Sequence, residues 1–145
     1  MFPLGKWSIL IWITLAILVG IQFLPVDRNS PVDAGVVEAP EEVVQILKRS
    51  CFDCHSNHTQ WPWYGYLAPV SWWVSHHIDE ARDALNLTTW NDYDADERAE
   101  FAEEIWDEVD RGNMPPDYYL WMHADAVLNP TEKQALAAWS ASAAD

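Results

Sequence analysis

The sequence predicts an all-α protein: a small helical domain with long ordered loops, preceded by one N-terminal transmembrane helix. Three observations predict this class. The N-terminal segment is almost wholly apolar, the remainder carries helical patterns bounded by proline, glycine and capping residues, and no stretch has the pattern of a β-strand. A chain of 145 residues, of which 50% are hydrophobic, has room for one modest domain besides such a segment.

Residues 1–24 are predicted to form a membrane anchor. No charged residue lies between Lys6 and Asp27, and residues 7–24 would span about 27 Å as a helix, roughly one bilayer core. A cleaved signal peptide is the alternative, but the apolar run is long for one and no small-x-small cleavage site follows it. Lys6, before the span, favours an N-terminus inside the cell. The rest would then lie in the periplasm, beyond a bacterial inner membrane.

The chain after the anchor divides into a linker, residues 25–39, and a helical domain, residues 40–145. The linker carries Pro, Asp, Ser and Gly without periodicity. The stretch "PEEVVQILKRS" predicts the first helix, with Pro40 at the first helical position. Its apolar residues recur at helical spacing, glutamates occupy the first turn and basic residues the last.

Three more helices are predicted, over residues 69–86, 94–112 and 129–142. The second begins at a proline, the third ends at a glycine, and the last begins with Asn-Pro, a capping residue and a first-turn proline. The aromatic stretch 56–69 is predicted to be an ordered loop. Residues 113–128 are predicted to form a proline-broken loop with a short helical turn at its end.

The acidic composition restricts the partners. Asp and Glu number 23 against 8 Lys and Arg, which gives a net charge of −15. Phosphates would be repelled by this surface, so the sequence predicts no nucleic-acid binding. A partner with a basic docking surface is favoured, and a merely solvated acidic surface is the alternative.

The stretch "CFDCH" holds the only two cysteines, Cys51 and Cys54, followed by His55. A redox-active C-x-x-C would need a βαβ context that this sequence does not predict, whereas C-x-x-C-H is the attachment signature of c-type haem. We expect both thiols to bind one haem c covalently as thioethers and His55 to be the proximal iron ligand. A disulfide beside a chance histidine is the alternative, and it leaves the helical context unexplained.

The sixth iron ligand is predicted to be Met114, in "GNMPPDYY". A thioether is a soft ligand suited to iron that changes its charge, and the two following prolines would stiffen the loop. The alternative is a methionine that only packs in the core. His77 and His123 are the rival ligands, and Met122 is a lesser one because no rigid turn presents it.

Donors for the haem propionates are predicted in the aromatic loop and on the second helix of the domain. An arginine can bind a carboxylate through two hydrogen bonds. The alternative is that the aromatic residues pack the core and the arginine pairs with Asp79. The predicted donors are Trp61, Trp63, Tyr64, Tyr66 and Arg82.

These residues fall into a wider pattern. C-F-D-C-H-S-N is followed by W-P-W-Y, P-V-S-W-W, H-x-x-E-x-R, L-N-x-T-x-W, M-P-P-x-x-Y and H-x-x-A-x-L, with Trp139 near the end. The pattern, over residues 40–140, resembles the haem-binding domain family of exported bacterial cytochrome c-like proteins. The resemblance implies a monohaem c-type domain and includes His77 and His123 in the family pattern.

The function expected from these observations is that of a membrane-anchored monohaem c-type cytochrome which carries single electrons in the periplasm and is not an enzyme. The expected partners are redox proteins with a basic docking surface. Two alternatives remain: a haem sensor or haem enzyme with five-coordinate iron, and a fixed electron-transfer subunit of a larger membrane redox complex.

Overall fold

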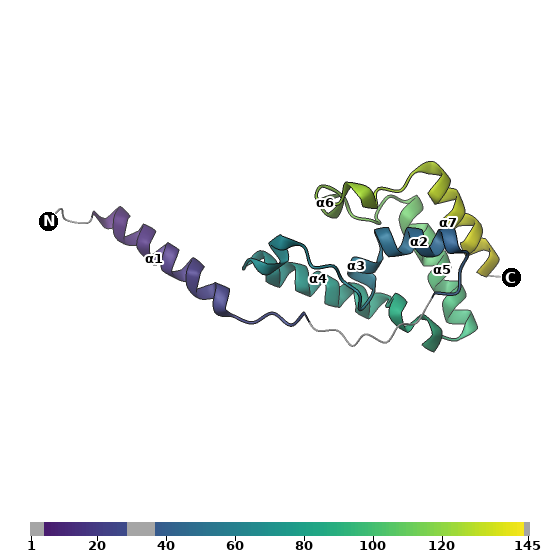
Figure 1. The fold of residues 1–145 in the computed structure, drawn as a ribbon, viewed down its shortest axis with the longest axis horizontal. Coiled ribbons are helices and arrows are strands. Elements are labelled where there is room, and N and C mark those ends of the chain that lie inside the picture. Colours follow the sequence, from purple (N-terminus) through teal and green to yellow (C-terminus); the bar gives the residue numbers. More distant parts are fainter. Residues whose placement is uncertain (1–4, 29–36, 144–145) are drawn as a thin grey trace. The chain divides into compact units, whose positions relative to one another are not determined.

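The computed structural model describes residues 5–28 and 37–143, and every regular element in these two ranges is helical, so the all-α prediction is confirmed (Figure 1). The described residues form two compact units. The first consists of residues 5–28 and 61–77, and the second of residues 37–60 and 78–143. Residues 29–36, most of the predicted linker, lie outside the described residues.

The first unit begins with α1, Lys6–Gly20, which continues into a 3₁₀ turn, η1, Ile21–Phe23. Together they form the one helix in the described ranges that is long and apolar enough to cross a membrane, with a mean hydropathy of 1.8 over Lys6–Phe23. None of that stretch is buried, which agrees with the apolar segment predicted over residues 7–24.

The aromatic loop and the start of α4 complete the first unit. The loop contains a 3₁₀ turn, η2, Trp63–Tyr66, and α4 is Val70–Ala84. Pro69 was predicted to be the first helical residue but lies just before the helix, where its carbonyl oxygen accepts the first backbone bonds of α4. The helix was predicted to end near Asn86 and ends at Ala84, because the Asn86 side chain accepts from the backbone N–H of Thr88 and caps η3 instead.

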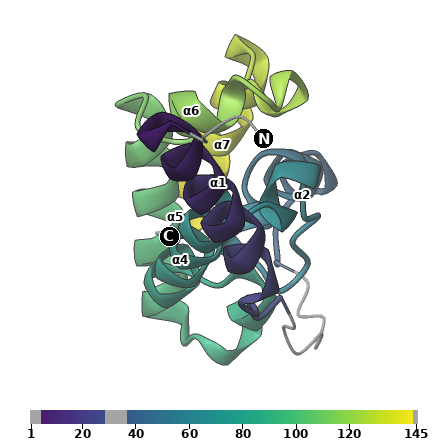
Figure 2. The ribbon, with the colours of Figure 1, turned by 90° about the vertical axis from the view of Figure 1, so that its left-hand side faces the viewer.

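The second unit contains the remaining elements. Within it, α7 packs against both α5 and α2, an arrangement visible in the two ribbon views (Figures 1 and 2). The elements are α2 (Glu41–Ser50), α3 (Phe52–His55), η3 (Leu87–Asp92), α5 (Ala95–Asp110), α6 (Asp117–Leu120), η4 (Ala124–Ala126) and α7 (Pro130–Ala143). The first helix of the domain therefore begins one residue after Pro40, and the loop predicted over residues 113–128 contains two short turns, α6 and η4, rather than one.

Capping residues explain where α5 and α7 begin. Asp94 accepts from the backbone N–H of Glu97 while Glu97 accepts from that of Asp94, both at 2.9 Å. Asn129 and Glu132 make the same reciprocal pair at the start of α7. After α5, Gly112 adopts φ = 76°, a backbone conformation that an L side chain strains, and this turn directs the chain toward Met114.

The core of the second unit is made by the apolar faces of α2, α5 and α7 with η3. Trp90 and Trp139 meet in it with their ring centroids 5.8 Å apart. At its edge, Arg49 on α2 donates to Glu132 on α7 at 2.7 Å. The buried cluster is Val37, Val43, Ile46, Leu47, Leu85, Leu87, Trp90, Ala102, Val109, Leu128, Leu136 and Trp139.

Candidate functional site

The C-x-x-C-H residues form a single turn at the end of α2. The carbonyl oxygen of Cys51 accepts from the backbone N–H of Cys54 at 3.2 Å and from that of His55 at 2.9 Å. Residues three and four apart are neighbours on such a turn, so Cys54 and His55 both lie beside Cys51. The three residues were predicted to act together, and because they are neighbours in sequence, one helical turn is enough to bring them together.

Cys51 and Cys54 are free thiols in the structure. Burial raises the pKa of Cys51 to about 12 and that of Cys54 to about 11, with smaller contributions from neighbouring negative charges. Thiols with such pKa values stay protonated at neutral pH and are poor nucleophiles for disulfide exchange. The surroundings of both thiols therefore disfavour the thiolate, unlike those of a thioredoxin-like redox motif.

His55 is held as a neutral imidazole with one nitrogen engaged. Its Nδ1 lies 3.2 Å from the carbonyl oxygen of Leu85. A carbonyl only accepts, so Nδ1 carries the proton and Nε2 keeps its lone pair. Burial lowers the pKa of His55, which favours the same neutral form. A metal-binding histidine is commonly oriented by a backbone carbonyl in this way, so these residues fit a haem iron.

The loop after His55 is fixed from α4. Ser56 is fully buried, donates through Oγ to the carbonyl of Phe52 at 2.7 Å, and its own carbonyl accepts from Arg82 Nε at 2.8 Å. Arg82 Nη2 donates to Thr59 Oγ1 at 2.9 Å, and Thr59 Oγ1 donates to the carbonyl of Asp53 at 2.7 Å. Arg82 therefore binds the loop after His55, residues 56–60, which we call the attachment loop. The sequence had suggested a propionate or Asp79 as its partner and not this loop. The contact of Arg82 with a propionate stays a prediction.

The loop is fixed a second time from η3. The backbone N–H of Asn57 donates to Thr88 Oγ1 at 2.8 Å, and the side chain of Asn86 donates to Asn57 Oδ1 at 3.0 Å. Thr88 is itself buried. Leu85 directly precedes Asn86. The segment whose Leu85 carbonyl accepts the hydrogen bond from His55 Nδ1 is therefore also hydrogen-bonded to the loop that follows His55.

A third connection runs from the C-x-x-C-H turn to α6. The carboxylate of Asp53 accepts from Tyr119 Oη at 2.9 Å and from the backbone N–H of Gln60 at 3.0 Å. The Tyr119 ring stacks on that of His123, with centroids 4.1 Å apart and planes 9° apart. Burial, followed by the negative charge of Asp53, raises the pKa of Tyr119. His123 is therefore in direct ring contact with Tyr119, whose hydroxyl group binds Asp53 in the C-x-x-C-H turn.

Met114 lies immediately beyond the Gly112 turn. Its backbone N–H donates to the carbonyl of Glu108 at 3.1 Å, and the side chain is 40% exposed. Met122 lies after α6 and is more exposed than Met114. The assignment of Met114 as sixth ligand stays a prediction.

The remaining predicted residues belong to the first unit. Trp61 lies beneath the guanidinium of Arg28, and Trp63 meets Tyr64 edge to face with centroids 5.8 Å apart. His77 has its Nδ1 2.9 Å from the carbonyl oxygen of Trp73, which occupies that nitrogen. As haem contacts, these residues stay predictions.

The sequence reasoning missed the residues that hold the turn rather than form it. Asp53, Asn57, Leu85, Thr88 and Tyr119 were not singled out. A signal existed, since several of them stand inside the recurring pattern: Asp53 and Asn57 in C-F-D-C-H-S-N and Tyr119 in M-P-P-x-x-Y. Their partners are distant in sequence, so the pattern alone did not reveal their contacts.

An all-helical domain that carries two free thiols and an imidazole held by a backbone carbonyl on a single turn has the donor set of a haem protein. In the described ranges, no group of three or more His, Cys, Asp or Glu side chains is arranged to hold a metal ion by itself. The chain belongs to the haem-binding domain family, whose match covers residues 16–142. Neither the curated proteins nor the solved structures include a match to this chain.

Proposed function

We propose that this haem-binding protein is a monohaem c-type cytochrome that carries single electrons in the periplasm. The observation that carries the proposal is the His55 imidazole, neutral and held through Nδ1 by Leu85, on the same turn as two free thiols. Bound haem would supply an iron that alternates between the ferric and ferrous states.

Cys51 and Cys54 would hold the haem by thioether bonds. Each attachment would be an addition of S–H across a vinyl group, with the sulfur on one carbon and the hydrogen on the other, so that no oxidant would be needed. His55 Nε2 would then be the proximal ligand and Met114 the sixth.

The hydrogen bonds around His55 support electron transfer over a sensor or enzyme function. Ser56, Asn57 and Leu85 are each bonded to other elements, so the imidazole has little freedom to move when the charge at its Nε2 changes. The sequence offers no nucleophile with a matched base. The charge of −15 favours basic redox partners, whether diffusing proteins or the other subunits of a membrane complex.

Helix α1 is proposed as the anchor that holds the protein in a bacterial inner membrane. Its length and its sequence, which carries no charged residue after Lys6, support this role. The mature protein should retain α1 and need detergent for its release from membranes. A soluble form that starts near residue 25 would show that α1 is a cleaved signal sequence.

Covalent attachment is tested by acid–acetone extraction. The haem should stay on the wild-type chain, and Cys51→Ser or Cys54→Ser should lower or abolish haem content. Haem that extracts freely from the wild-type protein would refute the c-type assignment while leaving membership of the family intact.

The sixth ligand and the electron-carrier function are tested by near-infrared absorption of the oxidised protein, which detects thioether ligation. Met114→Ala should abolish that band and let carbon monoxide bind the reduced protein, whereas the matched variant Met122→Ala should leave both unchanged. A wild-type haem that is already high-spin would favour the sensor or enzyme alternative. Loss of the band in His77→Ala or His123→Ala instead would indicate another ligand.

A further inference from the structure

Residues 66–73 of the first unit, "YLAPVSWW", expose apolar side chains and bury a polar one. Ser71, the one wholly polar side chain of the segment, is 2% exposed. The large apolar and aromatic side chains are between 36% and 57% exposed: Tyr66, Leu67, Val70, Trp72 and Trp73. A water-facing surface shows the reverse distribution, so this segment is suited to an apolar or amphipathic neighbour.

The charge pattern of the chain points to the same neighbour. No Asp, Glu, Lys or Arg lies between Asp53 and Asp79, in a chain that carries 23 acidic and 8 basic residues. An acidic surface is repelled by the anionic lipids of a membrane, whereas an uncharged aromatic surface is not. Tryptophan and tyrosine are the residues enriched at membrane–water interfaces, because their rings combine an apolar body with a polar group.

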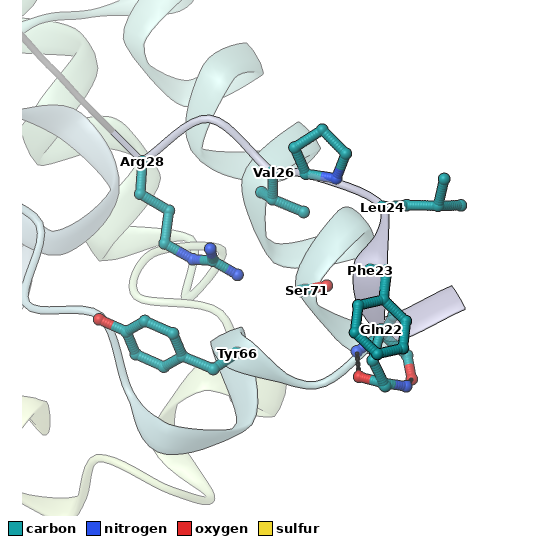
Figure 3. Close-up of a pocket in the computed structure, with 9 residues that line it drawn as sticks. Gln22, Phe23, Leu24, Val26, Arg28, Tyr66 and Ser71 are labelled. Carbon is teal, nitrogen blue, oxygen red and sulfur yellow. Dashed lines mark hydrogen bonds between the residues drawn. The ribbon is translucent and has the colours of Figure 1, made fainter. Parts of the chain in front are cut away.

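Hydrogen bonds hold this segment to the C-terminal end of the apolar helix. The side chain of Gln22 binds Ala68 twice, donating to its carbonyl oxygen at 3.0 Å and accepting from its backbone N–H at 3.0 Å (Figure 3). Arg28 Nη2 donates to the carbonyl of Gly65 at 2.8 Å. A segment bonded at this point lies where α1 would leave the bilayer.

The space between the end of α1 and the segment has the mixed character of a lipid headgroup region. It is a cavity of about 320 Å³ lined by apolar residues, among them Phe23 and Val26, and by the polar residues Gln22 and Ser71 (Figure 3). The Arg28 guanidinium also faces it, 4.6 Å above the ring of Tyr66. A cation in a lining that mixes polar and apolar groups matches the boundary where phosphate groups meet acyl chains.

We propose that residues 66–73 lie in the headgroup region of the bilayer that α1 crosses, with the exposed side chains of Leu67, Trp72 and Trp73 directed into the lipid. The inference rests on the membrane anchor proposed above and adds a second membrane contact to it. The chain would therefore hold the membrane through a span and an adjoining interfacial segment.

Spin labels in the full haem-loaded chain, reconstituted in phosphatidylcholine–phosphatidylglycerol nanodiscs, test this contact. Leu67→Cys places a label on the segment, and Leu18→Cys places one on α1. Val127→Cys is the matched control, because Val127 is an exposed aliphatic residue of similar exposure on the second unit. Thioether attachment would consume Cys51 and Cys54, so the chain without an added cysteine should take up no label.

The label at position 67 should collide with oxygen in preference to a water-soluble nickel chelate, several-fold more than the label at position 127. The label at position 18 should show the strongest preference for oxygen. If position 18 lies in lipid while position 67 behaves like position 127, the interfacial contact is refuted and the anchor stands. If position 18 is itself in water, both proposals fail. A label at position 67 that is shielded from both reagents would show that protein or haem, not lipid, covers the segment.

Discussion

Replacing Arg82 by alanine should destabilise the attachment loop more than the loss of a surface arginine would. The guanidinium donates to the carbonyl of buried Ser56 at 2.8 Å and to Thr59 at 2.9 Å. Hydrogen bonds from charged groups contribute roughly 1.5–3 kcal/mol each. Burial lowers the pKa of Arg82, which shows that lost hydration offsets part of this gain. We expect the free energy of unfolding to fall by about 2–3 kcal/mol in total.

The measurement is guanidinium denaturation of the haem-loaded protein, followed by far-ultraviolet circular dichroism. Arg111→Ala is the control, since Arg111 pairs with Asp107 at 2.7 Å while 62% and 48% of the two side chains are exposed. Such a pair contributes about 0.5 kcal/mol or less. Arg82→Lys keeps the charge but cannot reach both acceptors with one nitrogen. Its loss of unfolding free energy should therefore fall between those of Arg82→Ala and Arg111→Ala.

The reduction potential gives a second measurement for Arg82. Because its acceptors lie just after His55, Arg82→Ala should shift the potential or broaden the distribution of haem spectra, and Arg111→Ala should do neither. If Arg82→Ala unfolds with the same free energy as Arg111→Ala, the two bonds do not hold the loop and the reasoning is wrong.

Three further outcomes are expected. Tyr119→Phe should lower the free energy of unfolding by about 1–2 kcal/mol, because Asp53 loses a donor; an unchanged denaturation midpoint would contradict this. The bond from Arg49 lowers the pKa of Glu132 below its ordinary 4.5, so this pair stabilises the fold above that pH and the effect is lost as the pH falls through the folded-state pKa. The stability difference between wild type and Glu132→Gln should therefore shrink between pH 7 and pH 3, and a constant difference would argue against the pair. Gly112→Ala should cost about 1 kcal/mol by thermal denaturation, because φ is 76° there, and a stabilised variant would show that this turn adapts.

The sequence by itself determined the features with local causes. The helices α2, α5 and α7 follow from capping residues and apolar spacing, which act within one or two turns of the chain. The boundaries at Pro40 and Pro69 were wrong by one residue, since a proline fits both just before and just inside a helix. The haem family was also predictable, because Cys51, Cys54 and His55 depend only on being neighbours in one turn.

The tertiary structure decided which groups hold that turn. His55 Nδ1 meets the carbonyl of Leu85, 30 residues away, and Asp53 meets Tyr119, 66 residues away. Arg82 binds Ser56 and Thr59, two partners that the sequence did not suggest, and its contact with a propionate stays a prediction. Helical periodicity states which side of an element a residue occupies but not which element faces that side. That choice depends on how the apolar faces of distant helices pack together, so only the folded chain reveals it.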